Sequence, residues 1–207
     1  MIDTGSAWFD EAFAHAPLMA ILRGMGVDRS ARLATTAWDL GIDSVEVPLQ
    51  TPDDEAALRE VVRLAGDRGK VVGAGTIVSA EQVPLAVRAG ARYLVSPGLD
   101  PAIVRAAREH GLPLLPGVAT PSEVQLACSL GVTWLKAFPA QWLGADWFRH
   151  IRGPFPHVRF VATGGLDAGN AQLFLDAGVR VAAVGSALED PAQLERLAEL
   201  MATRRDR

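Results

Sequence analysis

The sequence predicts an α/β fold, namely a single-domain (β/α)8 TIM barrel with an extra N-terminal helix. Short apolar runs alternate with amphipathic segments at intervals of roughly 20–30 residues, which is the spacing of repeated βα units. The runs are rich in valine and leucine, as strands covered on both faces should be. The 207 residues are close to the lower size limit for eight such units, so residues 1–207 should form one domain with short loops.

Eight runs are predicted to be strands. In chain order they are MAILRG (19–24), SVEVPL (44–49), VVGAGT (71–76), YLVSPG (93–98), LPLLPG (112–117), WLKAFPA (134–140), RFVATGG (159–165) and VAAVGSA (181–187). A doubly wound open sheet is the competing architecture. It would need a glycine-rich nucleotide loop after its first strand, and RGMG (23–26) lacks the G-x-G-x-x-G spacing.

The segments between these runs carry signals for helix ends. A capping residue precedes a proline at Thr51-Pro52, Asp100-Pro101, Thr120-Pro121 and Asp190-Pro191. Thr120 and Glu123 predict a capping box. Five glycines stand where helices should end with a left-handed residue: Gly41, Gly90, Gly111, Gly131 and Gly178. Pro84 lies inside the third helical segment, so that helix should start late or bend. The segment 6–15 predicts the extra helix, at the bottom of the barrel.

Composition and charge exclude several classes of function. The formal net charge is −4, so the chain has no basic footprint for nucleic acid. No run of about 18 apolar residues predicts a membrane span, and the first residues lack the pattern of a signal peptide. Cys128 is the only cysteine, so no intrachain disulfide is expected. These features favour a cytoplasmic protein without a membrane or nucleic-acid partner.

Four strand residues occupy the same place in their units, five positions after the glycine that should end the preceding helix: Glu46, Val95, Lys136 and Ala183. They belong to the second, fourth, sixth and eighth strands, and alternate strands supply the side chains of one interior layer in such a barrel. Glu46 and Lys136 should therefore meet between two short apolar side chains. Arg23 lies on the inward face of the first strand, at the C-terminal end where active sites of these barrels are found.

These three charged residues each have a structural and a functional interpretation. Glu46 and Lys136 could form a buried ion pair, although such pairs are often no more stabilising than apolar replacements. Alternatively, Lys136 is a nucleophile that attacks a ketone, because a desolvated lysine amine exposes its lone pair, and Glu46 is the proton shuttle. Arg23 could pair with Glu46 or bind a substrate carboxylate through its planar guanidinium.

The loops after the last two strands predict a phosphate site. Thr163-Gly164-Gly165 follows the seventh strand and Gly185-Ser186 follows the eighth, where phosphates commonly bind in these barrels. The alternative is that the glycines only make tight turns. A metal site is not expected, because Glu46 is the only carboxylate at a strand end and the four histidines fall elsewhere: His15, His110, His150 and His157.

Together these motifs resemble the 2-keto-3-deoxy-6-phosphogluconate (KDPG) and 6-phosphogalactonate (KDPGal) aldolases, a family of small class I aldolases. The resemblance covers nearly the whole chain and rests on the order and spacing of short motifs. They are AILRG (20–24), VEVPLQTP (45–52), GAGT (73–76), SPG (96–98), PG (116–117), LKAFPA (135–140), TGG (163–165) and GS (185–186).

The resemblance implies a (β/α)8 barrel, usually a homotrimer, with no cofactor and no metal. It implies a Schiff base between Lys136 and the C2 ketone of the substrate, with Glu46 as the acid/base residue. It further implies that Arg23 and Thr76 hold the pyruvate-derived carboxylate. The phosphate would contact Gly164, Gly165, Gly185 and Ser186, and the pocket would be lined by Pro97, Phe138 and Thr163. The expected reaction is cleavage to pyruvate and D-glyceraldehyde 3-phosphate.

The two substrates of this family differ only at C4, and the motifs point both ways. Gln50 stands where the gluconate branch has arginine, and the arginine of AILRG (Arg23) and the VEVPL stretch resemble the galactonate branch. Thr163 resembles the gluconate branch, in which this threonine touches the C4 hydroxyl. We therefore expect a KDPGal aldolase, with KDPG aldolase activity or dual specificity as the alternative. A phosphosugar epimerase, a phosphate-binding synthase and a non-catalytic phosphosugar-binding barrel are more distant alternatives.

Overall fold

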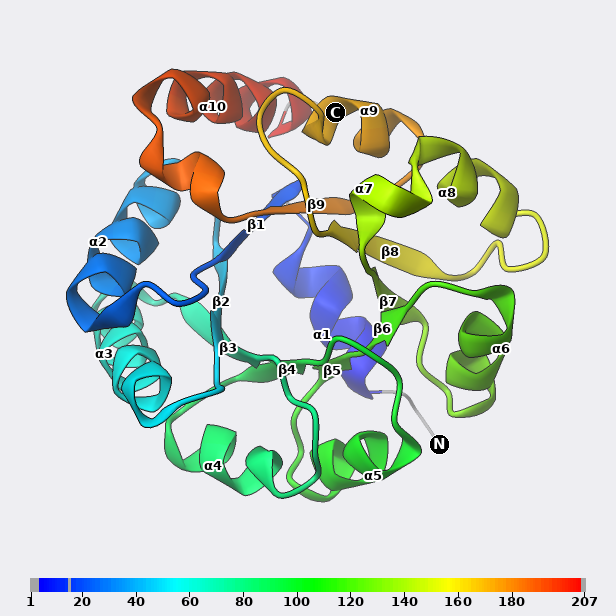
Figure 1. Cartoon of the computed structure of the whole chain (residues 1–207), viewed down its shortest axis with the longest axis horizontal. Helices are drawn as coiled ribbons and strands as arrows, with labels where there is room; N and C mark the ends of the chain where they lie inside the picture. Colours follow the sequence, from blue (N-terminus) through cyan, green and yellow to red (C-terminus); the bar gives the residue numbers. More distant parts are fainter. Residues whose placement is uncertain (1–3, 15, 206–207) are drawn as a thin grey trace.

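The computed structural model of the chain describes residues 4–14 and 16–205. In this part of the chain nine parallel strands curve into a nearly closed ring, and most helices lie outside it (Figure 1). The strands are β1 (Leu18–Ile21), β2 (Ser44–Pro48), β3 (Val71–Gly75), β4 (Tyr93–Val95), β5 (Leu114–Leu115), β6 (Gly117–Val118), β7 (Trp134–Ala137), β8 (Arg159–Thr163) and β9 (Val181–Val184). They are hydrogen-bonded in the order β5-β4-β3-β2-β1-β9-β8-β7-β6. The predicted barrel is therefore confirmed.

One predicted strand is divided. The fifth run forms β5 and β6 on either side of Pro116, which has no N–H group to donate to a neighbouring strand. The carbonyl of Leu115 accepts from the N–H of Ser96 (3.2 Å), and the carbonyl of Pro116 accepts from the N–H of Lys136 (2.9 Å). The divided strand thus pairs with β4 on one side and β7 on the other, which joins the two ends of the sheet.

Helices alternate with the strands, and most of them cover the outside of the barrel. They are α1 (Thr4–Ala12), α2 (Gly26–Asp39), α3 (Pro52–Arg68), α4 (Gln82–Arg88), α5 (Pro101–Glu109), α6 (Pro121–Ser129), α7 (Ala140–Leu143), α8 (Ala145–Ile151), α9 (Ala171–Asp176) and α10 (Pro191–Arg205), with a 3-10 turn η1 (Ser186–Glu189). Within the described residues, none of these helices combines the length and the apolar character needed to cross a membrane.

The predicted helix caps are present. Thr51 Oγ1 accepts from the N–H of Asp54 (3.2 Å), and Thr120 Oγ1 accepts from the N–H of Glu123 (3.3 Å). Both pairs are full capping boxes, whereas the sequence predicted only the second one. The five glycines expected to follow helices all have positive φ. Because α4 begins only at Gln82, Pro84 lies in its first turn, where N–H groups have no partner within the helix.

Several strands are shorter at their C-terminal ends than the sequence predicted. β1 ends at Ile21, β7 at Ala137 and β9 at Val184, although the apolar runs continue for three residues in each case. Glycine, proline and serine follow these ends, and there the chain leaves the ring to form loops. The residues that were predicted as the last part of the strands therefore surround the C-terminal mouth of the barrel.

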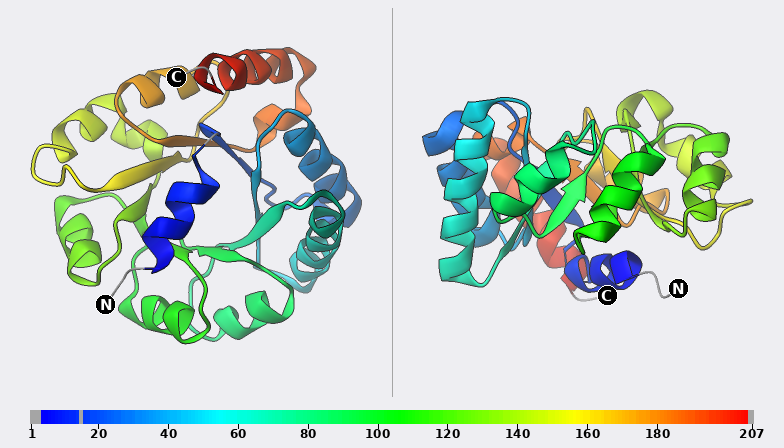
Figure 2. Two further views of the ribbon diagram at one scale, coloured as in Figure 1. Left: turned by 180° about the vertical axis from the view of Figure 1, so that it is seen from behind. Right: turned by 90° about the horizontal axis from the view of Figure 1, so that it is seen from below.

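The N-terminal helix α1 lies across the opposite end of the barrel (Figure 2). It was predicted for 6–15 and ends earlier, at Ala12; His15 lies outside the described residues. The ring of Phe13 stacks on Phe9 with 5.6 Å between the ring centres and lies 5.2 Å from the ring of Trp134. The indole N–H of Trp134 donates to Asp10 Oδ1 (3.0 Å). An aromatic cluster with its polar groups paired thus closes this end.

The register of the strands agrees with the predicted interior layer. Followed from Glu46 on β2 through its partner on β3, the strand register leads to the residue of β4 that lies two positions before Val95. Followed from Lys136 on β7 through its partner on β8, the register leads to the residue of β9 that lies two positions before Ala183. Strands in a closed barrel are tilted and staggered, so a layer drawn from alternate strands advances in this way. Val95 and Ala183 belong to one buried apolar cluster inside the ring.

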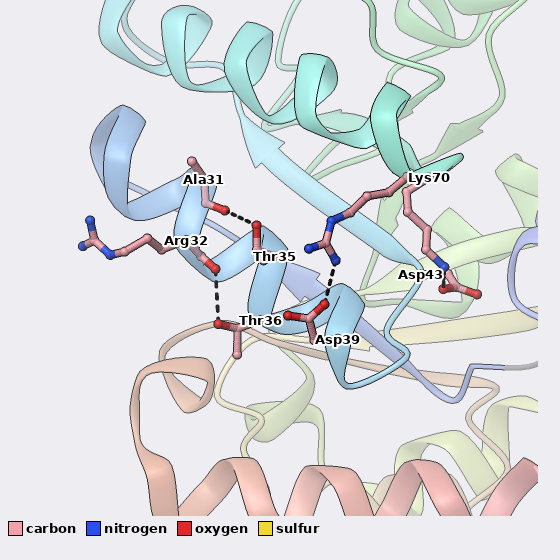
Figure 3. A network of polar contacts seen from close by, with 8 residues as sticks. Ala31, Arg32, Thr35, Thr36, Asp39, Asp43 and Lys70 are labelled. Atoms are coloured by element: carbon pink, nitrogen blue, oxygen red, sulfur yellow. Dashed lines mark hydrogen bonds and ion pairs between the residues drawn. The ribbon is translucent and has the colours of Figure 1, made fainter.

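Two ion pairs link neighbouring βα units on the outside of the barrel, one between the ends of α3 and α2 and one between the segments that lead into β3 and β2 (Figure 3). Arg68 Nη1 lies 2.6 Å from Asp39 Oδ1, and Lys70 Nζ lies 2.5 Å from Asp43 Oδ1. Partly exposed ion pairs of this kind each stabilise the fold by about 1 kcal/mol or less. Lys70 is therefore a paired surface lysine, unlike the lysine inside the barrel.

Candidate active site

Lys136 is buried inside the barrel without a charged partner. It lies on β7, and the whole residue is only 3% exposed. Its Nζ lies 5.4 Å from the centre of the Phe138 ring. Among the described residues no carboxylate lies within 4.0 Å of this ammonium group, so the structural ion pair with Glu46 is not formed. A buried lysine without a counter-ion is costly for stability, which favours a chemical role.

Glu46 is the second buried charged side chain of the ring. It lies on β2 and is 1% exposed. Both carboxylate oxygens are buried, and neither has a hydrogen-bond partner among the described residues. Tyr93 lies close enough for the Glu46 charge, together with burial, to raise the pKa of its phenol well above the usual value. A carboxylate with two free oxygens has acceptor capacity available for a substrate or for water.

A cavity of about 560 Å³ opens at the C-terminal ends of the strands. Seven of the residues predicted from the sequence line it: Arg23, Phe138, Thr163, Gly164, Gly165, Gly185 and Ser186. Lys136, Glu46, Thr76 and Pro97 are not among its lining residues. Lys136 is next to it, because its Nζ faces the ring of Phe138 in the cavity wall. Glu46 is paired in the β1–β2 register with Ile21, which also lines the cavity.

Arg23 lines the cavity and is hydrogen-bonded to Gln50, not to Glu46. Its guanidinium is exposed, and Nη1 donates to Gln50 Oε1 (2.8 Å). The alternative in which Arg23 pairs with Glu46 is therefore wrong. An arginine held by a neutral amide keeps its positive charge uncompensated, and the remaining N–H groups of its fork are suited to a carboxylate or phosphate.

The loop after β8 approaches the cavity with its backbone. Gly164 and Gly165 both have positive φ, +100° and +76°. A Cβ on Gly165 would lie 2.8 Å from Cβ of Gln141 and closer still to Oε1 of that residue, so only glycine fits. Asn170 Nδ2 donates to the carbonyl of Gly165 (2.9 Å) and fixes the loop. Ser186 is the first residue of η1, in the segment that follows β9.

Thr76 and Pro97 follow β3 and β4 and lie outside the cavity lining. Thr76 has φ of +58°, in the region that residues with a Cβ rarely adopt, and its Oγ1 is buried without a partner among the described residues. Strained backbone of this kind is concentrated at functional sites. The carbonyl of Pro97 lies so close to Gly117 that a side chain at Gly117 would clash with it.

Two residues near the site were missed by the sequence analysis. Gln141, in α7, lines the cavity beside Gly165. Gly75, in β3, lies directly against the side chain of Glu46. The alternation Gly73-Ala74-Gly75 was visible in the sequence and could have indicated a face of β3 without side chains. Nothing in the sequence shows that Gln141, the residue after Pro139-Ala140, lies against the glycine loop.

Other candidate groups do not form a second site of this kind. Trp147 and Phe148 pack against Phe160, whereas Trp142 is 88% exposed. No group of three or more histidine, cysteine, aspartate or glutamate residues in the described chain is placed to hold a metal ion. A second cavity of about 430 Å³ lies at the N-terminal end, between α1 and the ends of α5 and α6, and contains none of the predicted site residues.

Comparisons with known proteins agree on one family. The family model described as "Aldolase: KDPG and KHG aldolase" matches residues 9–202. The probable 2-dehydro-3-deoxy-6-phosphogalactonate aldolase of Rhizobium meliloti is 34% identical over 176 residues, which is 84% of this chain and 82% of that protein. The 2-dehydro-3-deoxy-6-phosphogalactonate aldolase of Escherichia coli K12 is 34% identical over 185 residues, 88% of this chain and 90% of that protein. A KDPG aldolase of Legionella pneumophila, solved with pyruvate as a covalent carbinolamine intermediate, superimposes with a TM-score of 0.80 at 30% identity, covering 93% of this chain and 96% of that one.

Proposed function

Because the chain belongs to the KDPG and KHG aldolase family, we propose that it cleaves 2-dehydro-3-deoxy-6-phosphogalactonate (KDPGal) to pyruvate and D-glyceraldehyde 3-phosphate. It is an aldolase, hence a carbon–carbon lyase. The observation that carries the proposal is Lys136, a buried lysine without a counter-ion next to the C-terminal cavity. The covalent pyruvate carbinolamine of the Legionella enzyme supports a Schiff base on this lysine.

The proposed reaction uses two residues in alternation. The Nζ amine of Lys136 attacks the C2 ketone carbon, and water leaves to give a protonated imine. Glu46 accepts the proton of the C4 hydroxyl, the C3–C4 bond breaks, and its electron pair moves into an enamine. The aldehyde D-glyceraldehyde 3-phosphate departs. The enamine then takes a proton at C3, and hydrolysis of the resulting imine releases pyruvate and restores the amine.

The remaining residues bind the two charged ends of the substrate. We assign the pyruvate-derived carboxylate to Arg23 and Thr76, because Arg23 carries an uncompensated charge and Thr76 has an unpaired hydroxyl. The phosphate is assigned to the glycine loops, where Gly164, Gly165 and Gly185 let backbone N–H groups approach and Ser186 adds a hydroxyl: all four line one cavity. Pro97, Phe138 and Thr163 complete the pocket.

The choice between the two sugar acids rests on C4. Gln50, which holds Arg23, favours the galactonate substrate, whereas Thr163 in the cavity wall favours KDPG. The Legionella structure and other relatives are KDPG aldolases, so this alternative is retained. Measuring kcat/KM for both sugar acids with one enzyme preparation decides between them. A higher value for KDPG would reverse the assignment without affecting the Schiff base.

Borohydride trapping with pyruvate tests the proposal directly. The chain contains only two lysines, Lys70 and Lys136, so the modified residue can be identified by peptide mass. We expect a stable adduct on Lys136 that is absent from Lys136→Met and unchanged in Lys70→Met, since Lys70 is a surface lysine paired with Asp43. A wild-type protein that binds the phosphosugar but traps no pyruvate would instead be an epimerase or a binding protein.

We further propose that residues 1–207 act as one domain, that the protein is cytoplasmic, and that it assembles as a homotrimer. Trp142 supports an interface between subunits. Its large apolar side chain is 88% exposed in the single chain, and covering it with a partner subunit would be favourable. The mass in solution from light scattering tests the trimer. A monomer at the concentration of the assay would refute it.

A further inference from the structure

The inner face of β3 carries no side chains at two successive inward positions. Gly73 and Gly75 are two residues apart on one strand and therefore point to the same face. Neither has a positive φ, so the backbone conformation does not require glycine. What requires glycine is space, because a Cβ at either position would overlap with a buried side chain from a neighbouring strand.

Glu46 and Tyr93 fill the space that these two glycines leave. A Cβ on Gly75 would lie 2.6 Å from Cγ of Glu46 and still closer to its carboxyl carbon and Oε1. A Cβ on Gly73 would lie 2.6 Å from Cδ2 of Tyr93 and closer to two other ring atoms. The hydroxyl of Tyr93 donates to the carbonyl of Val45 (2.8 Å), so its single proton is not available to Glu46.

No polar group of the described residues holds the Glu46 carboxylate in place. Both oxygens lack hydrogen-bond partners and no ion pair reaches them. The position of this carboxylate is therefore set by packing, with the bare backbone of β3 on one side and the ring of Tyr93 nearby. A carboxylate that is positioned only by shape will move if that shape changes.

We propose that Gly75 is a positioning residue for the reaction: the side chain that it lacks forms a socket for the carboxylate of Glu46. This inference rests on the proposed function, in which Glu46 transfers the proton of the C4 hydroxyl. The socket places the carboxylate on the same interior layer as Lys136 and leaves both of its oxygens free. In the same way, the missing side chain of Gly73 leaves space for the ring of Tyr93.

The first test is Gly75→Ala. The new methyl group displaces the carboxylate, and misplacing a catalytic group by about 1 Å can cost about 100-fold in rate. We therefore expect kcat to fall about 100-fold, while KM changes less than threefold because the groups assigned to carboxylate and phosphate binding are untouched. A wild-type kcat in Gly75→Ala would overturn the proposal.

Rescue separates positioning from a merely structural role. Glu46→Asp shortens the side chain by one methylene and relieves the closest overlap with the new methyl group, which is with Oε1 of Glu46. Glu46→Asp should lower kcat in both backgrounds, but the loss should be at least about tenfold smaller in the Gly75→Ala background than in the wild-type background. The reason is that the two sites are in contact, so their effects are coupled. Gly73→Ala is the matched control: it overlaps with Tyr93 instead, and Glu46→Asp should not improve it. Multiplicative effects of Gly75→Ala and Glu46→Asp would refute the socket.

Unfolding temperatures keep the test valid if Gly75→Ala is unstable or if the enzyme does not turn over. Gly75→Ala should lower the midpoint of thermal unfolding in the wild-type background and have a much smaller effect in a Glu46→Ala background. Equal destabilisation in both backgrounds would show that Gly75 does not serve Glu46. Absence of borohydride trapping by the wild-type protein would refute the proposed function while leaving this coupling measurable.

Discussion

In the aromatic cluster that closes the N-terminal end of the ring the indole N–H is paired, whereas several buried polar groups inside the ring toward the C-terminal end have no partner among the described residues. The indole N–H of Trp134 donates to Asp10, which also lies 3.3 Å from Arg159. Nearer the other end, Glu46 and Thr76 have buried oxygens without partners, and Lys136 has no counter-ion. The same strands contribute to both ends, so the difference does not come from the fold. Two other buried polar atoms without partners, Ser30 Oγ and Trp38 Nε1, lie on α2 outside the ring. Inside the ring, such groups gather toward the end that we propose binds and reacts, and stability alone does not favour them there.

Lys136→Met should produce the largest difference between activity and stability. Methionine has a similar length and no charge, so the variant should be as stable as the wild type or more stable. Activity should fall by about 10⁴-fold or more, because the substitution removes the proposed nucleophile. Steady-state kinetics and chemical denaturation of the same preparations measure both effects. Substantial remaining activity would show that the unpaired lysine is not the reacting group.

Phe13→Ala tests the opposite end and should have the opposite outcome. The substitution removes a ring that packs on Phe9 and Trp134, and such truncations in cores cost about 3–5 kcal/mol of unfolding free energy. At a temperature where the variant is folded, kcat/KM should stay within twofold of the wild type. Phe13→Leu, which keeps most of the volume, is the control and should lose much less stability. A loss of kcat in the folded variant would mean that the two ends are not independent.

The sequence was sufficient to predict the regular parts of this contrast. The period of βα units predicted the barrel, and the cap residues and glycines predicted most helix ends, because both depend on local physical preferences. The strand overruns at β1, β7 and β9 have a common reason. The residues that follow these strands include Arg23, Phe138 and Ser186, which line the cavity at the mouth of the barrel and do not continue a strand.

Candidate site residues could be proposed from the sequence only where a residue type carries its own signal. Lys136 and Glu46 stand out because charges are rare in buried strands, and the glycine loops stand out by composition. Their partners could not be predicted: Arg23 contacts Gln50 rather than Glu46, and Gly75 matters through what it lacks. Such relations depend on which strands become neighbours and in which register, which a single sequence does not specify.

Ser186→Ala sharpens the comparison within the reactive end by separating binding from chemistry. A hydrogen bond to a charged group contributes about 1.5–3 kcal/mol, so KM for the phosphorylated substrate should rise by about tenfold or more. The value of kcat should change less, because Ser186 takes no part in the chemical steps that we assign to Lys136 and Glu46. An analogue without the phosphate should react equally with both proteins. An equal loss for both substrates would remove Ser186 from the phosphate site.

Tyr93 lies where the two ends meet, and its titration should give the smallest effect. Its ring contacts Trp8 and Phe9 on the closed side, whereas burial and the charge of Glu46 raise the pKa of its phenol in the folded protein. An unfolded tyrosine ionises near pH 10, so the stabilisation is complete below that pH and decreases as pH rises further. The decrease is at most about 1.4 kcal/mol per pH unit.

Because Tyr93 is the only tyrosine, the ultraviolet absorbance of phenolate reports on this residue alone. We expect phenolate to appear only together with unfolding, and Tyr93→Phe to lose stability less steeply above pH about 10 than the wild type. The other groups that titrate at this pH are common to both proteins, so the difference between the two slopes belongs to Tyr93. Phenolate formed near pH 10 in a folded protein would show that water reaches the ring from the open end. In that case Glu46 would be solvated as well, and its free oxygens would no longer distinguish the reactive end from the closed one.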